Sequence, residues 1–254
     1  MSAHGSTLDG STLAGRRILL TRAADDSAAW AARLRLHGAV PVLLPCVRSE
    51  RFDDPESETT FRAALEHAAW MVFTSRQGVT AAAQLLNGRW PSTLRFAAVG
   101  PATARAVLDA FSTPALIAGT ATSAGIGTEL VALIRGASAL EHTRVVVVGA
   151  AAGRDDAVLA LARAGVSVTR IAVYRTIPAP PREPRLDLAT LTVDQVWLAS
   201  PSAVTGLRNQ AAWPADTHII SIGPTTSAAA RTAGFTVCAE AHAPTLLGML
   251  QAAG

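Results

Sequence analysis

The sequence predicts an α/β fold made of two related lobes with parallel sheets, and three observations carry this prediction. First, three strand–turn–helix signatures occur twice in the same order, about 125 residues apart. The pairs are Ile18–Pro45 with Val145–Tyr174, Met71–Val79 with Val196–Val204, and Ala97–Phe111 with Ile220–Phe235. Second, the strand-like segments are continuous apolar runs, as strands buried on both faces should be. Third, strand and helix signals alternate at a spacing typical of parallel sheets covered by helices.

The first repeat shows how each element follows from the residues. Ile18–Thr21 begins as an apolar run and predicts a buried strand. The helix that follows begins with Asp25, Asp26 and Ser27, which suit N-terminal capping and the positive end of the helix dipole. We expect this helix to end at Gly38, because glycine readily adopts the left-handed conformation that closes many helices.

The second copy repeats the pattern. Val145–Val148 predicts the equivalent strand, a helix is expected from about Asp155, and Gly165 is its expected end. Later in the chain, Gly234 is the expected end of the helix that follows Gly223-Pro224.

Two segments lie outside the repeats and are interpreted as crossings between the lobes. They are Pro45–Glu50 and Ala172–Pro178, and each follows a strand-like segment. The second continues into Pro178–Arg185, which is incompatible with a helix or a central strand. In this arrangement the chain starts in one lobe, builds the whole of the second and returns to finish the first. A tandem arrangement, divided near Ala139, fits the repeats about equally well.

Length and composition indicate a compact two-domain protein. The chain has 254 residues, of which 50% are hydrophobic and only 16% charged, so each lobe can bury its own core. No apolar run reaches the roughly 18 residues needed to span a bilayer. Met1–Gly15 is rich in Ser, Gly and Thr and is expected to be a flexible tail, not a secretion signal. Cys46 and Cys238 lack metal-ligand spacing, and a disulfide between them is not expected in a cytoplasmic protein.

All 22 basic residues are arginines. Codon bias in a GC-rich genome is the simplest explanation, but the absence of lysine has chemical consequences. It excludes a Schiff-base lysine, a pyridoxal phosphate anchor and a P-loop lysine. If an anion is bound, the positive charge of the side chains must come from arginine, assisted by backbone N–H groups.

The loops that follow the predicted strands carry the candidate ligand-binding residues. In open parallel sheets, ligands meet the loops at the carboxyl ends of the strands. Hydroxyl groups, exposed backbone N–H groups and helix N-termini at these loops can together hold a polycarboxylate. The candidates are Arg22, Ser75, Arg76, Thr103, Arg154, Ser200, Ser202, Thr225 and Thr226. For any single serine or threonine, N-capping is the simpler role, but the recurrence at every strand end favours an anionic ligand.

Familiar catalytic motifs do not occur in the sequence. None of the six histidines lies in a metal or nucleophile motif, and Gly149–Gly153 is not a GxGxxG fingerprint. The site is therefore expected to bind and position its ligand more than to perform acid–base work. Tyr174, the only tyrosine, lies on the second crossing, and its phenol can donate a proton to a leaving oxygen. A strand tyrosine with a surface hydroxyl is the alternative role.

Six segments, taken in their order, resemble the uroporphyrinogen-III synthase family. They are LLTRAADDSAAWAARLRLHGAVPVLLP, VFTSRQGV, AVGPATARAV, IAVYRTIP, LASPSAV and SIGPTTSAAARTAGFTV. The resemblance extends over Arg17–Leu250, and the position of VYRT before SPSAV is its most specific part. SRQGV departs from the family pattern because it lacks the Asn or Pro that is often found in this turn.

The resemblance implies two flavodoxin-like α/β/α lobes with parallel sheets, joined by a two-stranded β ladder. It assigns residues 17–46 together with 178–254 to lobe 1 and residues 52–172 to lobe 2. Residues 1–16 are then expected to be a flexible N-terminal tail.

The reaction implied by the resemblance is the cyclisation of linear hydroxymethylbilane to uroporphyrinogen III, with loss of water and inversion of ring D. No metal or organic cofactor is implied. Tyr174 matches the tyrosine of the family's VY(x)T motif and is the candidate to assist departure of the hydroxyl. The residues that match hydroxyl positions of the family's turns are Ser75, Thr103, Ser200, Thr225 and Thr226.

The expected partners are a small-molecule substrate and, transiently, hydroxymethylbilane synthase. We expect a cytoplasmic monomer that binds neither nucleic acid nor membrane. A non-catalytic two-lobed sensor for an anionic tetrapyrrole or another small molecule is the alternative function. A nucleotide-using enzyme is disfavoured by the missing phosphate-binding motifs, and nucleic-acid binding by dispersed arginines without an aromatic platform.

Overall fold

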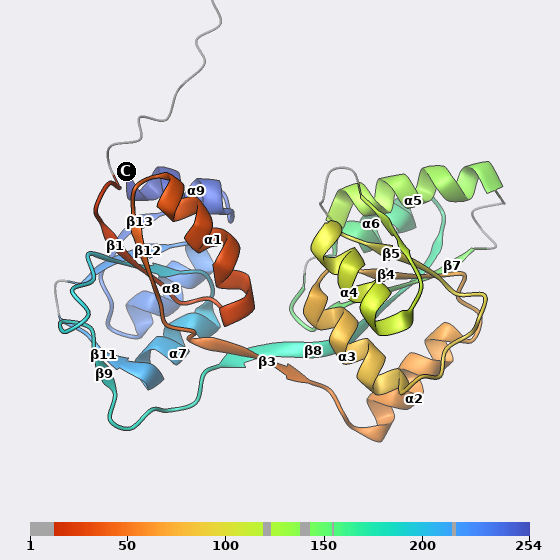
Figure 1. Ribbon diagram of the computed structural model, residues 1–254, viewed down its shortest axis with the longest axis horizontal. Helices are drawn as coiled ribbons and strands as arrows, with labels where there is room; N and C mark the ends of the chain where they lie inside the picture. The colour runs from red at the N-terminus through yellow and green to blue at the C-terminus, as the bar shows by residue number, and fades with distance from the viewer. Residues whose placement is uncertain (1–12, 119–122, 138–142, 154, 215–216) are drawn as a thin grey trace, which may run out of the picture. The chain divides into compact units, whose positions relative to one another are not determined.

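A computed structural model describes residues 13–118, 123–137, 143–153, 155–214 and 217–254. The chain forms two compact units (Figure 1). Unit 1 comprises Met1–Arg48 and Ile177–Gly254, and unit 2 comprises Ser49–Thr176. The tandem alternative does not describe this chain, because a division near Ala139 would cut through unit 2.

Unit 1 is built on a five-stranded sheet in the order β13-β12-β10-β1-β2, with every neighbouring pair parallel. Its strands are β1 (Arg17–Leu20), β2 (Val40–Leu43), β10 (Gln195–Leu198), β12 (His218–Ser221) and β13 (Val237–Glu240). Its helices are α1 (Ala24–Leu36), α7 (Pro201–Gln210), α8 (Pro224–Thr232) and α9 (Leu246–Ala253). A separate short pair joins β9 (Leu186–Asp187) to β11 (Ala211–Ala212).

Unit 2 is built on a six-stranded sheet in the order β3-β8-β7-β4-β5-β6. Its strands are β3 (Val47–Arg51), β4 (Trp70–Phe73), β5 (Arg95–Ala98), β6 (Ala115–Ile117), β7 (Arg144–Ala150) and β8 (Ser167–Pro178). Its helices are α2 (Pro55–Leu65), α3 (Arg76–Leu86), α4 (Pro101–Phe111), α5 (Ser123–Ala137) and α6 (Asp156–Arg163). The chain passes between the units within β3 and β8, which are neighbours in this sheet and form the expected ladder.

The two sheets have the same spatial order when the sequence repeats are superimposed. The repeats match β7 with β1, β8 with β2, β4 with β10, and β5 with β12. The order β8-β7-β4-β5-β6 in unit 2 then corresponds strand for strand to the order β2-β1-β10-β12-β13 in unit 1. The units therefore share the flavodoxin-like order, although the chain enters the two sheets at different strands.

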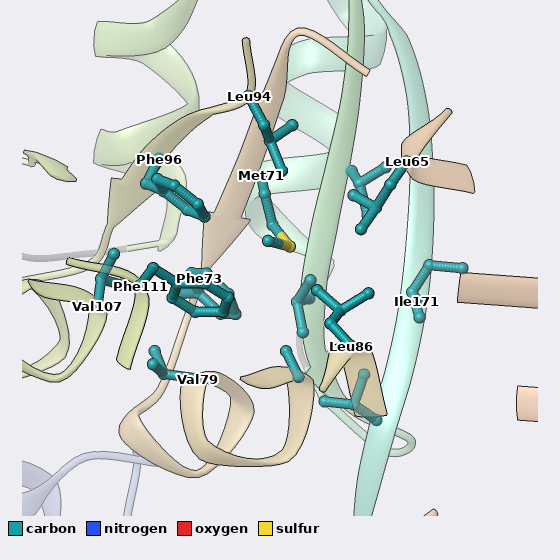
Figure 2. Packing of buried hydrophobic residues seen from close by; sticks show 14 of the residues in the cluster. Leu65, Met71, Phe73, Val79, Leu86, Leu94, Phe96, Val107, Phe111 and Ile171 are labelled. Carbon is teal, nitrogen blue, oxygen red and sulfur yellow. The ribbon is translucent and has the colours of Figure 1, made fainter. Parts of the chain in front are cut away.

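Both faces of each sheet are buried under helices, as expected for parallel sheets. In β4, Met71 and Phe73 pack into one core cluster while Trp70 and Val72 pack into another on the opposite face. Figure 2 shows the first cluster, in which the rings of Phe73 and Phe111 lie 5.7 Å apart between their centroids. Helices α2, α3 and α4 cover this face of the sheet, and α5 and α6 cover the other.

Two details of the predicted helices need correction. Helix α1 has Ala23 at its N-cap and no side-chain cap, so Asp25 and Asp26 lie in the first turn but do not cap it. Ser27 lies inside the helix, where its hydroxyl donates back to the carbonyl of Ala23 at 3.0 Å. The expected helix ends hold, since the three glycines predicted there all have positive φ angles. They are Gly38 (75°), Gly165 (84°) and Gly234 (89°).

The expected N-terminal tail is only partly described. Residues 1–12 lie outside the described residues. Leu13 is buried in the core of unit 1, and the N–H of Gly15 donates to the carbonyl of Gly38 at 2.9 Å. The chain therefore packs against unit 1 from residue 13, before the expected boundary at Arg17. Among the described residues, no helix has the length and apolar character that crossing a bilayer requires.

Candidate functional site

Each sheet has one point at which the direction of strand addition reverses. In unit 2, β5 and β6 are added on one side of β4, and β7 and β8 are added on the other side. The reversal therefore lies between β4 and β7. In unit 1 it lies between β1 and β10. Ligands of doubly wound sheets bind outside the carboxyl ends of the strands at such a reversal. The loops at these two places carry Ser75 in unit 2 and Arg22 and Ser200 in unit 1.

Ser75 and Ser200 are N-cap residues in the same position of the two units. The Oγ of Ser75 accepts from the N–H of Gly78 at 3.0 Å, and the Oγ of Ser200 accepts from the N–H of Ala203 at 3.2 Å. The sequence therefore predicts their capping role correctly. Each cap leaves the serine hydroxyl proton available to another acceptor, because the backbone N–H occupies only a lone pair of the oxygen.

A register shift in β8 places Tyr174. Gly149 pairs with Ala172, whereas the next residue, Ala150, pairs with Tyr174, so β8 carries one extra residue at this point. Such a bulge disturbs the alternation of side chains along a strand. Val173 and Tyr174, although consecutive, accordingly pack against the same core cluster. The bulge therefore turns Tyr174 to the face of the sheet that α3 covers.

On that face, the hydroxyl oxygens of Tyr174 and Ser75 lie 3.0 Å apart. Either group can donate this hydrogen bond. If Ser75 donates, negative charge that develops on the phenol oxygen of Tyr174 is stabilised by the Ser75 hydroxyl and by the N-terminal dipole of α3. Tyr174 is half-buried, so the ring is fixed by packing while the residue keeps access to solvent.

Arg22 follows β1 in unit 1 and is largely buried, with 27% of its side chain exposed. Its guanidinium lies 4.5 Å from the centre of the Trp30 ring and 3.7 Å from the carboxylate of Asp26. Burial lowers the pKa of Arg22, and Asp26 opposes this effect, but an arginine stays protonated at neutral pH. Its Nε is a buried nitrogen without a hydrogen-bond partner in the described chain, so it is a donor that a ligand oxygen would satisfy.

The other predicted site residues differ in accessibility. Thr103 and Thr226 occupy equivalent positions in the first turns of α4 and α8, and both are buried, at 6% and 3% exposed. Thr225 and Arg76 are exposed. The Oγ of Ser202 lies 3.0 Å from that of Ser200. Arg154 lies outside the described residues.

A polar cluster in unit 1 is absent from the sequence prediction. Ser221 ends β12 and Ser227 lies in α8, and their hydroxyl oxygens are 2.5 Å apart. Ser227 also donates to the carboxylate of Glu240 at the end of β13. A difference between the sequence repeats could have revealed this cluster. The first copy has Ala98 and Ala104 at the positions where the second has the two serines.

The two cysteines are free thiols in the structure. Cys46 is buried, and this burial raises the pKa of its thiol to about 12, so it is not a thiolate nucleophile at neutral pH. Within the described ranges, no group of three or more His, Cys, Asp or Glu side chains is arranged to hold a metal ion.

The fold and these loops define a protein with two doubly wound α/β units, each with hydroxyl and cationic side chains at the carboxyl edge of its sheet. Residues 28–251 match the family described as uroporphyrinogen-III synthase HemD. The match covers most of the chain, which therefore belongs to the uroporphyrinogen-III synthase family.

Individual relatives are more distant. The chain is 27% identical over 175 residues to the porphyrin biosynthesis protein HemD of Ruminiclostridium josui, which covers 65% of this chain but only 32% of that protein. It thus spans about a third of the length of this curated relative.

Two solved structures match most of the chain. The uroporphyrinogen-III synthetase of Helicobacter pylori is 17% identical, with a TM-score of 0.51 over 93% of this chain and 97% of that chain, and it supports the fold. A mutant uroporphyrinogen III synthase of Thermus thermophilus is 21% identical, with a TM-score of 0.49 over 93% of this chain and 96% of that chain.

Proposed function

We propose that this chain is a uroporphyrinogen-III synthase that cyclises hydroxymethylbilane with loss of water and inversion of ring D. Membership of the family supports this activity. The structural observation that carries it is the contact between the hydroxyls of Tyr174 and Ser75, 3.0 Å apart at the ligand-binding edge of unit 2.

The first chemical step is departure of the substrate hydroxyl. The C–O bond breaks with its electron pair on oxygen, and the phenol of Tyr174 supplies the proton that turns this oxygen into water. A tyrosine suits the task because its ordinary pKa of about 10 keeps the proton on the phenol at neutral pH. Ser75 stabilises the resulting phenolate by donating its hydroxyl hydrogen. The pyrrole carbon that closes the ring later loses a proton, so the net reaction releases one water and restores the phenol.

The remaining task is to hold a flexible polycarboxylate in one conformation. Positioning of this kind can supply a large part of a rate enhancement. We propose that exposed or partly exposed donors at the two carboxyl edges contact the carboxylates. They are Arg22, Ser200, Ser202 and Thr225 in unit 1 and Arg76 in unit 2, with Arg154 kept on sequence grounds alone. The single hydroxyl hydrogen of Ser75 is donated to Tyr174, so Ser75 acts through the phenol and not on a carboxylate.

Thr103 and Thr226 take a different place in this proposal. Both are buried in the first turns of their helices, so a contact with substrate requires these turns to open. Their equivalent positions in the two units favour a shared role in packing the first turns of α4 and α8, with the neighbouring exposed Thr225 meeting the ligand.

We further propose that the lobes suggested by the family, residues 17–46 with 178–254 and residues 52–172, are the functional bodies. The protein is proposed to act as a cytoplasmic monomer that receives its unstable substrate from hydroxymethylbilane synthase. The free thiols of Cys46 and Cys238 are compatible with a reducing compartment.

An isomer assay tests the activity. Purified protein is added to hydroxymethylbilane synthase and its substrate, and the oxidised products are separated into type I and type III porphyrins. The proposal expects the type III isomer to dominate, against type I in the reaction without the protein. Type I alone in both reactions would refute the proposal. If the protein then still bound the bilane tightly, the sensor function would take its place.

A further inference from the structure

The side chain of Arg170 on β8 forms hydrogen bonds with the loop that follows β7. Its Nη2 donates to the carbonyls of Ala150, Ala151 and Gly153 at 2.5, 3.3 and 3.4 Å, and its Nε lies 2.6 Å from the carboxylate of Asp155. With 26% of its side chain exposed, the guanidinium is shielded enough for these charge-assisted bonds to matter. One arginine thus binds several carbonyl groups of a loop at the carboxyl edge of the sheet of unit 2.

The same loop holds the backbone of Tyr174. The N–H of Ala151 donates to the carbonyl of Tyr174 at 2.8 Å, directly after the register shift between β7 and β8. The loop is therefore fixed from two sides, by the side chain of Arg170 and by the main chain of Tyr174. Movement of the loop would be transmitted to the bulge and from there to the phenol.

The packing around Gly153 shows how closely the guanidinium approaches the loop. A Cβ atom built on Gly153 would lie 3.0 Å from the carbonyl oxygen of Ala150 and 3.2 Å from Nη2 of Arg170. Only a residue without a side chain fits between these groups without displacing one of them. The sequence GAAAG, which does not fit a dinucleotide fingerprint, thereby has a structural explanation in the arginine that fills the loop.

The bulge needs such support, because it disrupts the regular ladder between β7 and β8. Without it, Tyr174 would point to the same face as Arg170 and Ala172, away from Ser75. In unit 1 the equivalent pair, β1 with β2, is in regular register over Arg17–Leu20, which ends before the residues equivalent to the bulge. The position of β2 that is equivalent to Arg170 is Leu43, so the arginine belongs only to the unit that carries Tyr174.

We propose that Arg170 is a positioning residue for Tyr174: by fixing the loop of residues 150–153 it holds the bulge and sets the phenol against Ser75. The kinetic consequence of this inference rests on the proposed synthase function, whereas its structural consequence does not. Because lysine offers a compact point charge instead of a planar fork, Arg170→Lys is expected to replace it poorly.

Tyr174 permits a direct test because it is the only tyrosine in the chain. Protein made with 3-fluorotyrosine should give a single ¹⁹F resonance. We expect Arg170→Met to shift or split this resonance, and Gly153→Ala, which keeps the arginine but displaces it, to do the same. Arg163→Met, which removes an exposed arginine of α6, is the matched control and should leave the resonance in place.

The kinetic arm measures type III formation by the same variants. Misplacing a reactive group by about 1 Å can cost up to about 100-fold. We therefore expect kcat of Arg170→Met to fall about 10- to 100-fold with little change in KM, and millimolar guanidinium to restore part of the rate in Arg170→Ala. An unmoved ¹⁹F resonance in folded Arg170→Met and Gly153→Ala would overturn the inference. If wild-type protein forms no type III isomer, the proposed function fails, and the resonance still decides the role of Arg170.

Discussion

Units 1 and 2 share a strand order but differ in what they place at the same edge of the sheet. In unit 2 the N-cap Ser75 meets the phenol of Tyr174 from a bulged strand. In unit 1 the equivalent Ser200 meets Ser202, two residues further along its own helix. The cap is therefore common to the fold, whereas the tyrosine partner is particular to one unit.

The second difference between the units is a polar pair that occurs in unit 1 and not in unit 2. Unit 1 carries the hydrogen-bonded Ser221 and Ser227 where unit 2 has Ala98 and Ala104. The apolar pair shows that this position of the fold does not require polar groups. Because the scaffold is duplicated, features found in both units serve the fold, and features found in one unit are candidates for function.

Gly206 provides the largest expected effect and tests a packing difference between the units. A Cβ atom on Gly206 in α7 would lie 1.6 Å from the carbonyl oxygen of Cys46, whereas the equivalent residue of α3 is the buried Ala81. We expect Gly206→Ala to lower the free energy of unfolding by about 3 kcal/mol or more, because a backbone group must move. Ala81→Gly should cost about 1 kcal/mol through helix propensity. Chemical denaturation measures both, and equal small losses would show that α7 packs no more tightly than α3.

Tyr174→Phe is the next largest effect and removes one oxygen atom from unit 2. We expect kcat for type III formation to fall about 100-fold, as for loss of a general acid. The free energy of unfolding should fall by only about 1 kcal/mol, the usual net contribution of one hydrogen bond. Rate and denaturation are measured on the same preparation. An unchanged kcat would exclude the phenol from the reaction and leave Tyr174 as a packing residue.

Ser75→Ala and Ser200→Ala form a matched pair across the units. Each variant loses an N-cap, so each should lose about 1 kcal/mol of stability. Their kinetics should differ, with Ser75→Ala lowering kcat about tenfold through loss of a stabilising hydrogen bond and Ser200→Ala acting mainly on KM. Steady-state kinetics separate these parameters. Identical kinetic changes would indicate that the two serines have the same role.

The smallest expected effect is a change in the pH dependence of stability at Asp54. This residue is the N-cap of α2, a helix of unit 2 that lies outside the sequence repeats. Its carboxylate accepts from the N–H and the hydroxyl of Ser57, both at 2.8 Å, and these bonds lower its pKa. A depressed folded-state pKa contributes stability above the unfolded value of about 3.9 that is lost as the pH falls below it. Asparagine caps equally well without titrating. We thus expect Asp54→Asn to lose slightly less Tm than wild type between pH 7 and pH 3, and an identical loss would contradict this role.

The fold follows from the sequence to a large extent because the signals are local. Apolar runs, N-cap serines and left-handed glycines each act within a few residues, and the repeated order of these signals gives the strand order twice. Ser75 and Ser200 could be found as caps for the same reason. Asp25 and Asp26 show the limit of such rules, since suitable residues lie in the first turn of α1 without capping it.

The missing parts of the site depend on contacts distant in sequence. The bulge at Tyr174 is a shift in register between β7 and β8, and alternation along β8 alone gives the wrong face. Arg170 reaches a loop about 20 residues earlier in the chain. Burial also depends on the whole fold, so the hydroxyls of Thr103 and Thr226 mark them as candidates in the sequence although the structure buries both.

A double-mutant cycle on Ser75 and Tyr174, read as the rate of type III formation, tests the central claim most directly. If the two hydroxyls act as one unit, Ser75→Ala should slow the wild-type enzyme but have no further effect in the Tyr174→Phe background. Ser200→Ala should act independently in both backgrounds. Additive losses for Ser75 and Tyr174 would contradict the claim that the bulged strand places the phenol to work with the cap of α3.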